Sequence, residues 1–304
     1  MQCPKQTYTS RINYAGIGCI LVWMNRPKTG FHLSIDVENL SRSTETLEFE
    51  RSLDPLLFKL NESNIKATFF VLGQLVTRWK TRIAEIQSEG HEVALHGYSH
   101  TSIEALGKQK FTEETKIGCD ILSEALGHQT YGYRAPYFSL TKKCQWAPEI
   151  IKSLDFTYSS SVLPAWNPQA SYPDAPKNPF KWSCGLVEFP VQSYGFGRLR
   201  VPLLGGAYIR LAPEFMYRAI KDLTNTSKFV YTYCHPYDFD TNESFYRVED
   251  GSWIFSKLLF MRRDLMLTRI LQLVHTDQKT FSELMSDKQF INELTVFSPK
   301  TTND

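Results

Sequence analysis

The chain has 304 residues, of which 42% are apolar and 13% aromatic, and its formal net charge at pH 7 is +2. This length and composition suit one large globular domain or two small ones. The 34 basic and 32 acidic residues nearly balance, so the chain lacks the electrostatic footprint of a nucleic-acid-binding protein. Nucleic acid is therefore excluded as the expected partner.

The first apolar segment is residues 13–24, NYAGIGCILVWM, which lies between Arg11 and Arg26. It is too short to span a bilayer. A signal peptide is the alternative, but no small-x-small cleavage site follows before FHLSIDVEN. We therefore expect an added strand or hairpin, within an N-terminal extension over residues 1–30.

From residue 31 to about 235, short apolar runs alternate with helical patterns, which is typical of a parallel sheet or barrel. A closed (β/α) barrel is the economical architecture, and an open doubly wound sheet is the alternative. Strands are expected at 31–36, 67–72, 91–95, 131–134, 156–161, 186–190 and 229–235.

Two helices have clear boundary signals. Residues 76–90 end at Gly90, and residues 112–127 begin with Thr112 as N-cap and end at Gly127. The proline-rich stretch 165–185 is expected to be a covering loop. A later basic and apolar helix, 262–277, is expected to dock on the barrel, with a place on a membrane surface as the alternative.

The six cysteines are scattered and form no C-x-x-C pair. Neither a zinc ribbon nor a dense disulfide framework is expected, and reduced thiols in a cytoplasmic protein fit best. The cysteines lie at positions 3, 19, 119, 144, 184 and 234.

Polar side chains gather at the C-terminal ends of the expected strands, which in a barrel meet around one mouth. His96 and His100 are four residues apart, and one helical turn would let two ring nitrogens meet one metal ion. Singly, each residue has an ordinary structural explanation, but their joint occurrence favours a mononuclear metal hydrolase. The full set is Asp36, Glu38, His96, His100, Arg134, Tyr137 and His235.

The ordered motifs D-x-E, H-x-x-x-H, R-A-P-Y and H-P resemble those of the polysaccharide deacetylases, carbohydrate esterase family four, over roughly residues 31–275. KATFFVLG, GYRAPYFSL and GGAYIRLAP are further matching phrases, closest to the branch linked to exopolysaccharide and cell-surface polysaccharide synthesis. The resemblance implies a deformed (β/α) barrel of about seven strands over residues 31–290, followed by a tail at 291–304.

The resemblance also implies the cofactor. Glu38, His96 and His100 would hold one divalent ion, with zinc expected first and cobalt or nickel as alternatives. The ion would polarise the substrate carbonyl and lower the pKa of a bound water.

The remaining residues receive acid–base and orienting roles from the same resemblance. Asp36 would take the proton of the attacking water while Arg134 orients it, and the main-chain N–H of Tyr137 would support the oxyanion. His235 would protonate the departing amine.

Two features depart from the commoner family pattern. Asp36-Val37-Glu38 replaces a pair of adjacent aspartates, yet alternation along a strand keeps residues 36 and 38 on one side, which leaves their division of roles open. The family's tryptophan-bearing motif is absent near 158–162, so the lining of the acetyl pocket is open. In LLGGAYIRLAPEF (203–215), Arg210 either binds an anionic sugar or belongs to a simple turn feeding a helix.

The implied activity is removal of N-acetyl groups from an N-acetylated oligo- or polysaccharide, free or lipid-linked. The rivals are a deformylase or other C–N hydrolase on a lipid-linked amino sugar, and a non-catalytic carbohydrate-binding barrel. The expected location is cytoplasmic, including the inner face of the membrane with peripheral contact. The sequence leaves the oligomeric state open.

Overall fold

The computed structural model describes residues 30–39, 49–166, 170–196, 199–227, 229–248, 251–275 and 277–299. The strand or hairpin predicted at 13–24 lies outside these residues. Within them, none of the helices combines the length and the apolar character needed to cross a bilayer.

Short strands form the centre of the molecule. Their bounds are β1 (Phe31–His32), β2 (Ser34–Val37), β3 (Thr68–Val71), β4 (Glu92–Leu95), β5 (Gly132–Tyr133), β6 (Tyr158–Ser159), β7 (Phe180–Trp182), β8 (Val187–Glu188), β9 (Tyr194–Phe196), β10 (Leu199–Val201), β11 (Val230–Tyr231) and β12 (Thr295–Phe297). Eight of them pair in the order β12-β7-β8-β6-β5-β4-β3-β2, and β11 pairs in parallel with β1, which directly precedes β2.

All seven predicted strands are present, with the first divided into β1 and β2, and they run parallel from β11 through β1/β2, β3, β4, β5 and β6 to β8. The deformed barrel is therefore confirmed. A closed barrel is not confirmed, because no strand pairing joins β8 to β11 in the described part of the chain. A side chain spans this seam: the main-chain N of Tyr231 donates to Oε1 of Gln192 over 3.2 Å.

Two sequence boundaries need correction. The expected covering loop at 165–185 contains β7, which pairs antiparallel with β8. The expected tail from 291 contains β12, which pairs in parallel with β7 and so belongs to the sheet. Both strands have only three residues, too few for an alternating pattern to stand out in the sequence.

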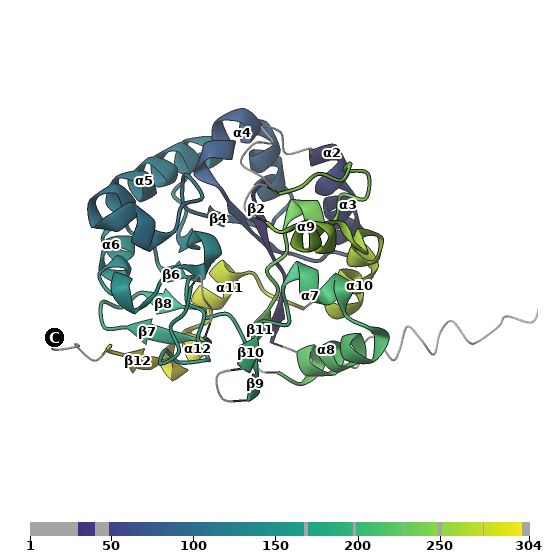
Figure 1. The fold of residues 1–304 in the computed structure, drawn as a ribbon. Coiled ribbons are helices and arrows are strands. Elements are labelled where there is room, and N and C mark those ends of the chain that lie inside the picture. The colour runs from purple at the N-terminus through teal and green to yellow at the C-terminus, as the bar shows by residue number, and fades with distance from the viewer. Residues whose placement is uncertain are drawn as a thin grey trace, which may run out of the picture.

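Helices surround the strands. Figure 1 shows α4, α5 and α6 along one outer side and α7, α8 and α10 along the other. Their bounds are α2 (Phe49–Ser52), α3 (Asp54–Glu62), α4 (Gly73–Ser88), α5 (Ile103–Leu126), α6 (Ala147–Ser153), α7 (Gly206–Leu211), α8 (Glu214–Thr226), α9 (Trp253–Phe260), α10 (Met266–Leu273), α11 (Phe281–Met285) and α12 (Lys288–Glu293), with 3₁₀ turns η1 (Pro136–Phe138), η2 (Lys142–Cys144), η3 (Pro236–Asp238) and η4 (Arg263–Leu265).

The predicted helices have correct ends and one wrong beginning. α5 ends at Gly127 in the left-handed conformation, as expected, but it begins after Ser102, whose Oγ accepts from the N–H of Ala105. Thr112 is thus not an N-cap, and its hydroxyl instead donates to the carbonyl of Lys108. The helix predicted at 262–277 is represented by η4 and α10, and α10 docks against α7 and α8 as expected.

Strand alternation separates two cores. In β3, Phe69 and Val71 join the large cluster beneath the outer helices, whereas Phe70 points into the barrel. The barrel interior is filled by aromatic rings around Phe281, the first residue of α11. The main-chain N of Phe281 donates to Thr68, the first residue of β3, so α11 closes the end of the barrel opposite the carboxyl ends of the strands.

Candidate metal and proton-transfer site

The first strand places its polar residues inside the barrel. Ile35 and Val37 pack in the outer core, so Ser34, Asp36 and Glu38 share the opposite, inner side. Because side chains repeat every two residues along an extended chain, D-x-E delivers both carboxylates to one mouth, as the sequence predicted.

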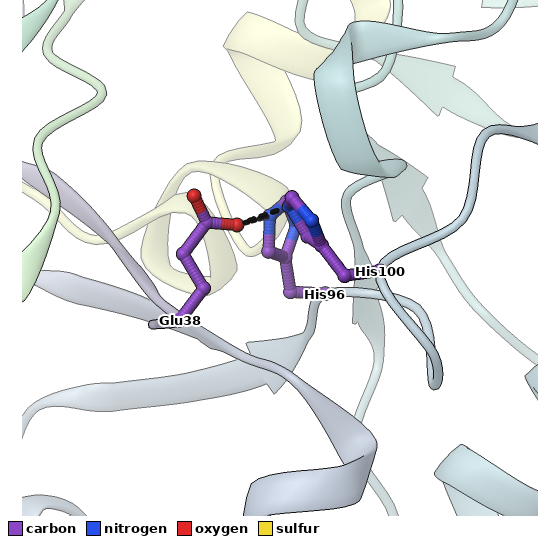
Figure 2. A group of neighbouring side chains, drawn as sticks. All are labelled: Glu38, His96 and His100. Carbon is purple, nitrogen blue, oxygen red and sulfur yellow. Dashed lines mark ion pairs between the residues drawn. The ribbon is translucent and has the colours of Figure 1, made fainter. Parts of the chain in front are cut away.

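Glu38, His96 and His100 form a compact group whose ligand atoms all lie within 4.8 Å of one another. Figure 2 shows both imidazoles turned toward the carboxylate of Glu38. The Nε2 atom of His96 lies 3.3 Å from Oε2 of Glu38, and Nε2 of His100 contacts the same oxygen. The three residues predicted as metal ligands thus converge.

The H-x-x-x-H spacing works differently from expectation, because His96 and His100 lie in the loop after β4 and not on a helical turn. His100 has a positive φ of 52°. Its ring packs 4.6 Å, centroid to centroid, from the ring of Tyr137 in η1. The loop is held from outside by Glu114 on α5, whose Oε2 accepts from the hydroxyl of Ser99. Nothing in the sequence motif pointed to Glu114.

Arg134 contacts both a predicted metal ligand, His96, and the predicted base, Asp36. Its main-chain carbonyl accepts from Nδ1 of His96 at 3.1 Å, which orients the ring so that Nε2 faces Glu38. Its guanidinium donates to Oδ1 of Asp36 at 2.5 Å and to the hydroxyl of Ser34 at 3.0 Å. The side chain is fully buried, and the ring of Phe70 lies 3.8 Å from its Cζ atom.

The stretch 158–162, where the family's tryptophan is absent, contributes buried serines. The hydroxyl of Ser160 accepts from Arg134 at 3.1 Å and itself donates to the main-chain carbonyl of Phe189 on the neighbouring strand segment. This segment therefore anchors the guanidinium of Arg134.

The residues present fit a divalent cation. Oε2 of Glu38 is buried and accepts no hydrogen bond from any described residue, although two imidazoles face it. Burial raises the pKa of Glu38, but the adjacent His100 and His96 outweigh this and hold it well below its usual value. An ionised carboxylate with two imidazoles supplies three donors and leaves a fourth position open, which is the donor set of catalytic zinc sites.

His235 lies beside this cluster, with Nε2 3.6 Å from Oε1 of Glu38. Its Nδ1 donates to Oδ2 of Asp238 at 3.2 Å, which fixes the ring orientation. Burial alone would lower the pKa of His235, but the hydrogen bond to Asp238 and the charge of Glu38 raise it to about 9. The pairing with Asp238 thus favours the protonated form of the imidazole.

Asp238 and Arg210 extend this arrangement and were not assigned to the site from sequence. Arg210 is fully buried, and its Nε donates to Oδ1 of Asp238 at 2.9 Å. It therefore does not bind a sugar, as one reading of LLGGAYIRLAPEF had it. The available signal was the spacing H-P-Y-D, since a carboxylate three residues after His235 can cap the main chain there.

The double glycine of the same motif is explained by close packing. A Cβ on Gly206 would lie 2.0 Å from Oδ2 of Asp238, and one on Gly205 would lie 2.4 Å from Cζ of Tyr233. Only residues without a side chain allow α7 to approach the segment that carries His235 this closely.

The geometry therefore places a cluster of three metal-type donors at the mouth of the barrel, beside a carboxylate paired with Arg134 and an imidazole paired with Asp238. Comparison with protein families agrees. Residues 46–159 match the polysaccharide deacetylase family, and residues 160–286 match a domain of unknown function, DUF3473. The match over residues 46–159 confirms the resemblance to the polysaccharide deacetylases seen in the motifs.

Individual relatives are similar over part of their length. The peptidoglycan-N-acetylglucosamine deacetylase of Bacillus cereus is 30% identical over 95 residues, which is 31% of this chain and 34% of the relative. The peptidoglycan deacetylase of Helicobacter pylori is 26% identical over 110 residues, 36% of each chain. The matches thus span about a third of the length of these curated relatives.

The fold also matches a solved structure. The crystal structure of a candidate polysaccharide deacetylase from Mycobacterium smegmatis superposes with a TM-score of 0.54 at 18% identity, covering 89% of this chain and 94% of that one. At this identity the match concerns the fold, which is the distorted (β/α) barrel.

Proposed function

We propose that the protein is a metal-dependent N-deacetylase acting on the amino sugars of a polysaccharide. The observation that carries this proposal is the convergence of three metal-type donors, Glu38, His96 and His100, beside the Arg-paired Asp36 and the Asp238-paired His235. The relatives named as peptidoglycan and chitin deacetylases support the substrate class.

A divalent ion in this cluster would supply Lewis-acid polarisation of the acetyl carbonyl and a water of lowered pKa. Asp36 then accepts the proton of the attacking water, because its side chain lies on the inner side with that of Glu38 and Arg134 contacts only its Oδ1. Arg134 keeps Asp36 in place through the 2.5 Å contact and balances its buried charge. In this scheme Glu38 acts as ligand and Asp36 as base.

His235 acts at the opposite end of the scissile bond. As the new C–O bond forms and the C–N bond breaks, Nε2 donates its proton to the amine nitrogen, giving acetate and a free amino sugar. The developing oxyanion is assigned to the main-chain N–H of Tyr137, whose residue borders His100. Asp238 keeps the imidazolium oriented throughout.

The finer assignments are also proposals. We assign zinc as the resident ion because Glu-His-His is a common catalytic zinc donor set, with cobalt or nickel as substitutes. We assign an exopolysaccharide or cell-surface polysaccharide as substrate from the phrases GYRAPYFSL and GGAYIRLAP, and a cytoplasmic location from the cysteine pattern.

The test is product release by the purified chain from N-acetylated and N-formylated glucosamine oligosaccharides, after chelation and with zinc, cobalt or nickel restored. Metal-dependent release of acetate is expected. Release of formate alone would make the protein a deformylase. Glycan binding without release of either acid, with every metal, would make it a carbohydrate-binding barrel.

A further inference from the structure

Helix α9 has an unusual composition for a surface helix. Its sequence is WIFSKLLF, and Ser256 is its only buried residue. Trp253, Ile254 and Phe255 are 55%, 69% and 50% exposed, respectively. A helix that is apolar on all sides normally lies in a core or against an apolar partner, so this surface is built to be covered.

The backbone of α9 is firmly held, so the exposure does not come from a loose segment. Ser252 caps the helix by accepting from the N–H of Phe255 at 3.1 Å. At the other end, the guanidinium of Arg210 donates to the carbonyls of Leu258 and Leu259, each at 2.9 Å, and to that of Met261. A buried arginine therefore fixes the helix with its apolar side chains outward.

The same surface includes further apolar residues. We call the exposed side chains Trp253, Ile254, Phe255, Leu258 and Met261 the α9 face. Arg262 reaches from the end of this segment to the carbonyls of Leu211 and Ala212, just before α8. Exposed Phe215 and Met216 lie at the start of α8.

The charge of the α9 face indicates the chemistry of its partner. The charged residues of the segment 251–262 are Lys257 and Arg262, both basic, whereas Glu249, Asp250 and Asp264 flank it in the sequence. Nζ of Lys257 lies 3.7 Å from the ring centroid of Trp253, which places a cation at the edge of the apolar surface. Tryptophan with flanking basic residues is typical of membrane interfaces. In a symmetric dimer through this face, by contrast, the basic residues of both copies would meet.

We propose that the α9 face is a peripheral docking surface for an anionic lipid bilayer. The apolar side chains enter the interfacial layer, and Lys257 and Arg262 meet the anionic headgroups. The sequence had offered a membrane surface as the alternative for 262–277, but α10 is packed on the protein and the preceding helix carries the exposed apolar residues.

The α9 face is joined to the proposed active site. Arg210, which holds the carbonyls of α9, also donates to Asp238, and Asp238 orients His235. A bilayer against α9 would thus lie next to the proton-donating side of the mouth. If the proposed deacetylase activity holds, this arrangement favours an amino sugar carried on a membrane lipid; the docking itself does not depend on that activity.

The test is flotation of the full chain with vesicles of phosphatidylcholine alone or mixed with phosphatidylglycerol. We expect binding to the mixed vesicles. The double variant Ile254→Ser/Phe255→Ser should lower the partition coefficient by about tenfold or more, because two interfacial side chains are lost. Lys257→Gln should weaken binding to the anionic vesicles only. The matched control is Phe58→Ser, since Phe58 is 65% exposed on α3, and its binding should be unchanged.

Absence of vesicle binding by the wild type would overturn the proposal, as would equal binding by the double variant and the Phe58→Ser control. Self-association that the double variant abolishes, without vesicle binding, would make the face an interface between copies. The double variant should release acetate from a water-soluble oligosaccharide at the wild-type rate. A wild type that floats with vesicles but releases no acetate would refute the deacetylase and leave the docking surface standing.

Discussion

Two sides of the mouth, one with the proposed metal ligands and one with the proposed proton donor, are held by different kinds of structure. Glu38 and His96 follow parallel strands whose main-chain ladders fix them. His235 begins a 3₁₀ turn and is fixed by a buried chain of charges through Asp238 to Arg210. Main-chain hydrogen bonds between strands form with almost any side chain at the position. A chain of buried ion pairs, by contrast, is strongly destabilised when one charged member is removed.

The family boundaries fall between these two sides. His96, His100 and Arg134 lie within the matched deacetylase region, while His235, Asp238 and Arg210 lie within DUF3473. DUF3473 also contributes β8 and β11 to the same barrel. The region of unknown function thus supplies the second part of the candidate site, namely His235, the proposed proton donor, and the residues that hold it.

Removing a metal ligand should have the largest effect. The wild type should carry about one divalent ion per chain, and His96→Ala or His100→Ala should each lose it. Acetate release should then fall by about 10³-fold or more, since the ion supplies several kcal/mol of transition-state stabilisation. Elemental analysis and rate measurement decide this, with His128→Ala on the surface as control. A His96/His100 double variant with stoichiometric metal would refute the cluster.

Removing the proton donor should affect rate alone. His235→Ala should slow turnover by about 10²- to 10⁴-fold while the metal remains, because the amine must then leave without its proton. Metal content and turnover are measured on the same sample, which distinguishes loss of the metal from loss of the proton donor. A folded, metal-loaded variant with normal turnover would place the acid elsewhere.

Substitutions at Asp36 and Glu38 test which of the two carboxylates is the metal ligand and which is the base. Asp36→Asn should keep the ion and lose activity by about 10²-fold or more, because the amide cannot accept the proton. Glu38→Gln should weaken metal binding, with activity partly restored by excess metal. Titration of metal affinity in both variants is the measurement. If Asp36→Asn loses the ion and Glu38→Gln keeps it, the two roles are reversed.

Asp238→Asn should change the pH profile of the proton-donating side. The charge of Asp238 helps raise the pKa of His235 to about 9, so neutralising it lowers that pKa. Activity needs protonated His235 and falls as pH rises through its pKa. The alkaline limb of kcat against pH should therefore move to lower pH by about one unit or more. If the alkaline limb stays at the same pH, the group that titrates there is not His235.

The smallest expected effect concerns the loop that carries His100. Glu114→Gln weakens the contact with Ser99, so metal affinity should fall by about tenfold or less while kcat at saturating metal stays unchanged. The control is Glu113→Gln, on the exposed side of the same helix. Equal metal affinity in both variants would show that the loop holds without Glu114.

The barrel strands and their polar ends were predictable because both follow from local pattern. Apolar runs with β-branched or aromatic residues marked β3 and β4, and the two-residue period put Asp36 and Glu38 on one side. The histidines were found by residue type and place. The conformation of the loop that carries them could not be predicted, because the positive φ of His100 depends on packing against η1 and α5.

The parts missed by sequence depend on contacts between distant segments. Arg210 and Asp238 are 28 residues apart, and nothing local shows that they pair in the interior. Likewise, α9 reads as an ordinary core helix from its composition, and only the structure shows its apolar residues exposed. β7 and β12 are too short to be recognised before their pairing is seen.

The pairing of Phe31 with Val230 joins residues about 200 positions apart. At ordinary translation rates of 5–20 residues per second, the edge of β1 waits roughly 10–40 s for β11 to be synthesised. During that time its main-chain groups are open to incorrect partners. A nascent chain therefore needs protection until β11 emerges, and the proposed site is complete only when β11 brings His235 to the mouth.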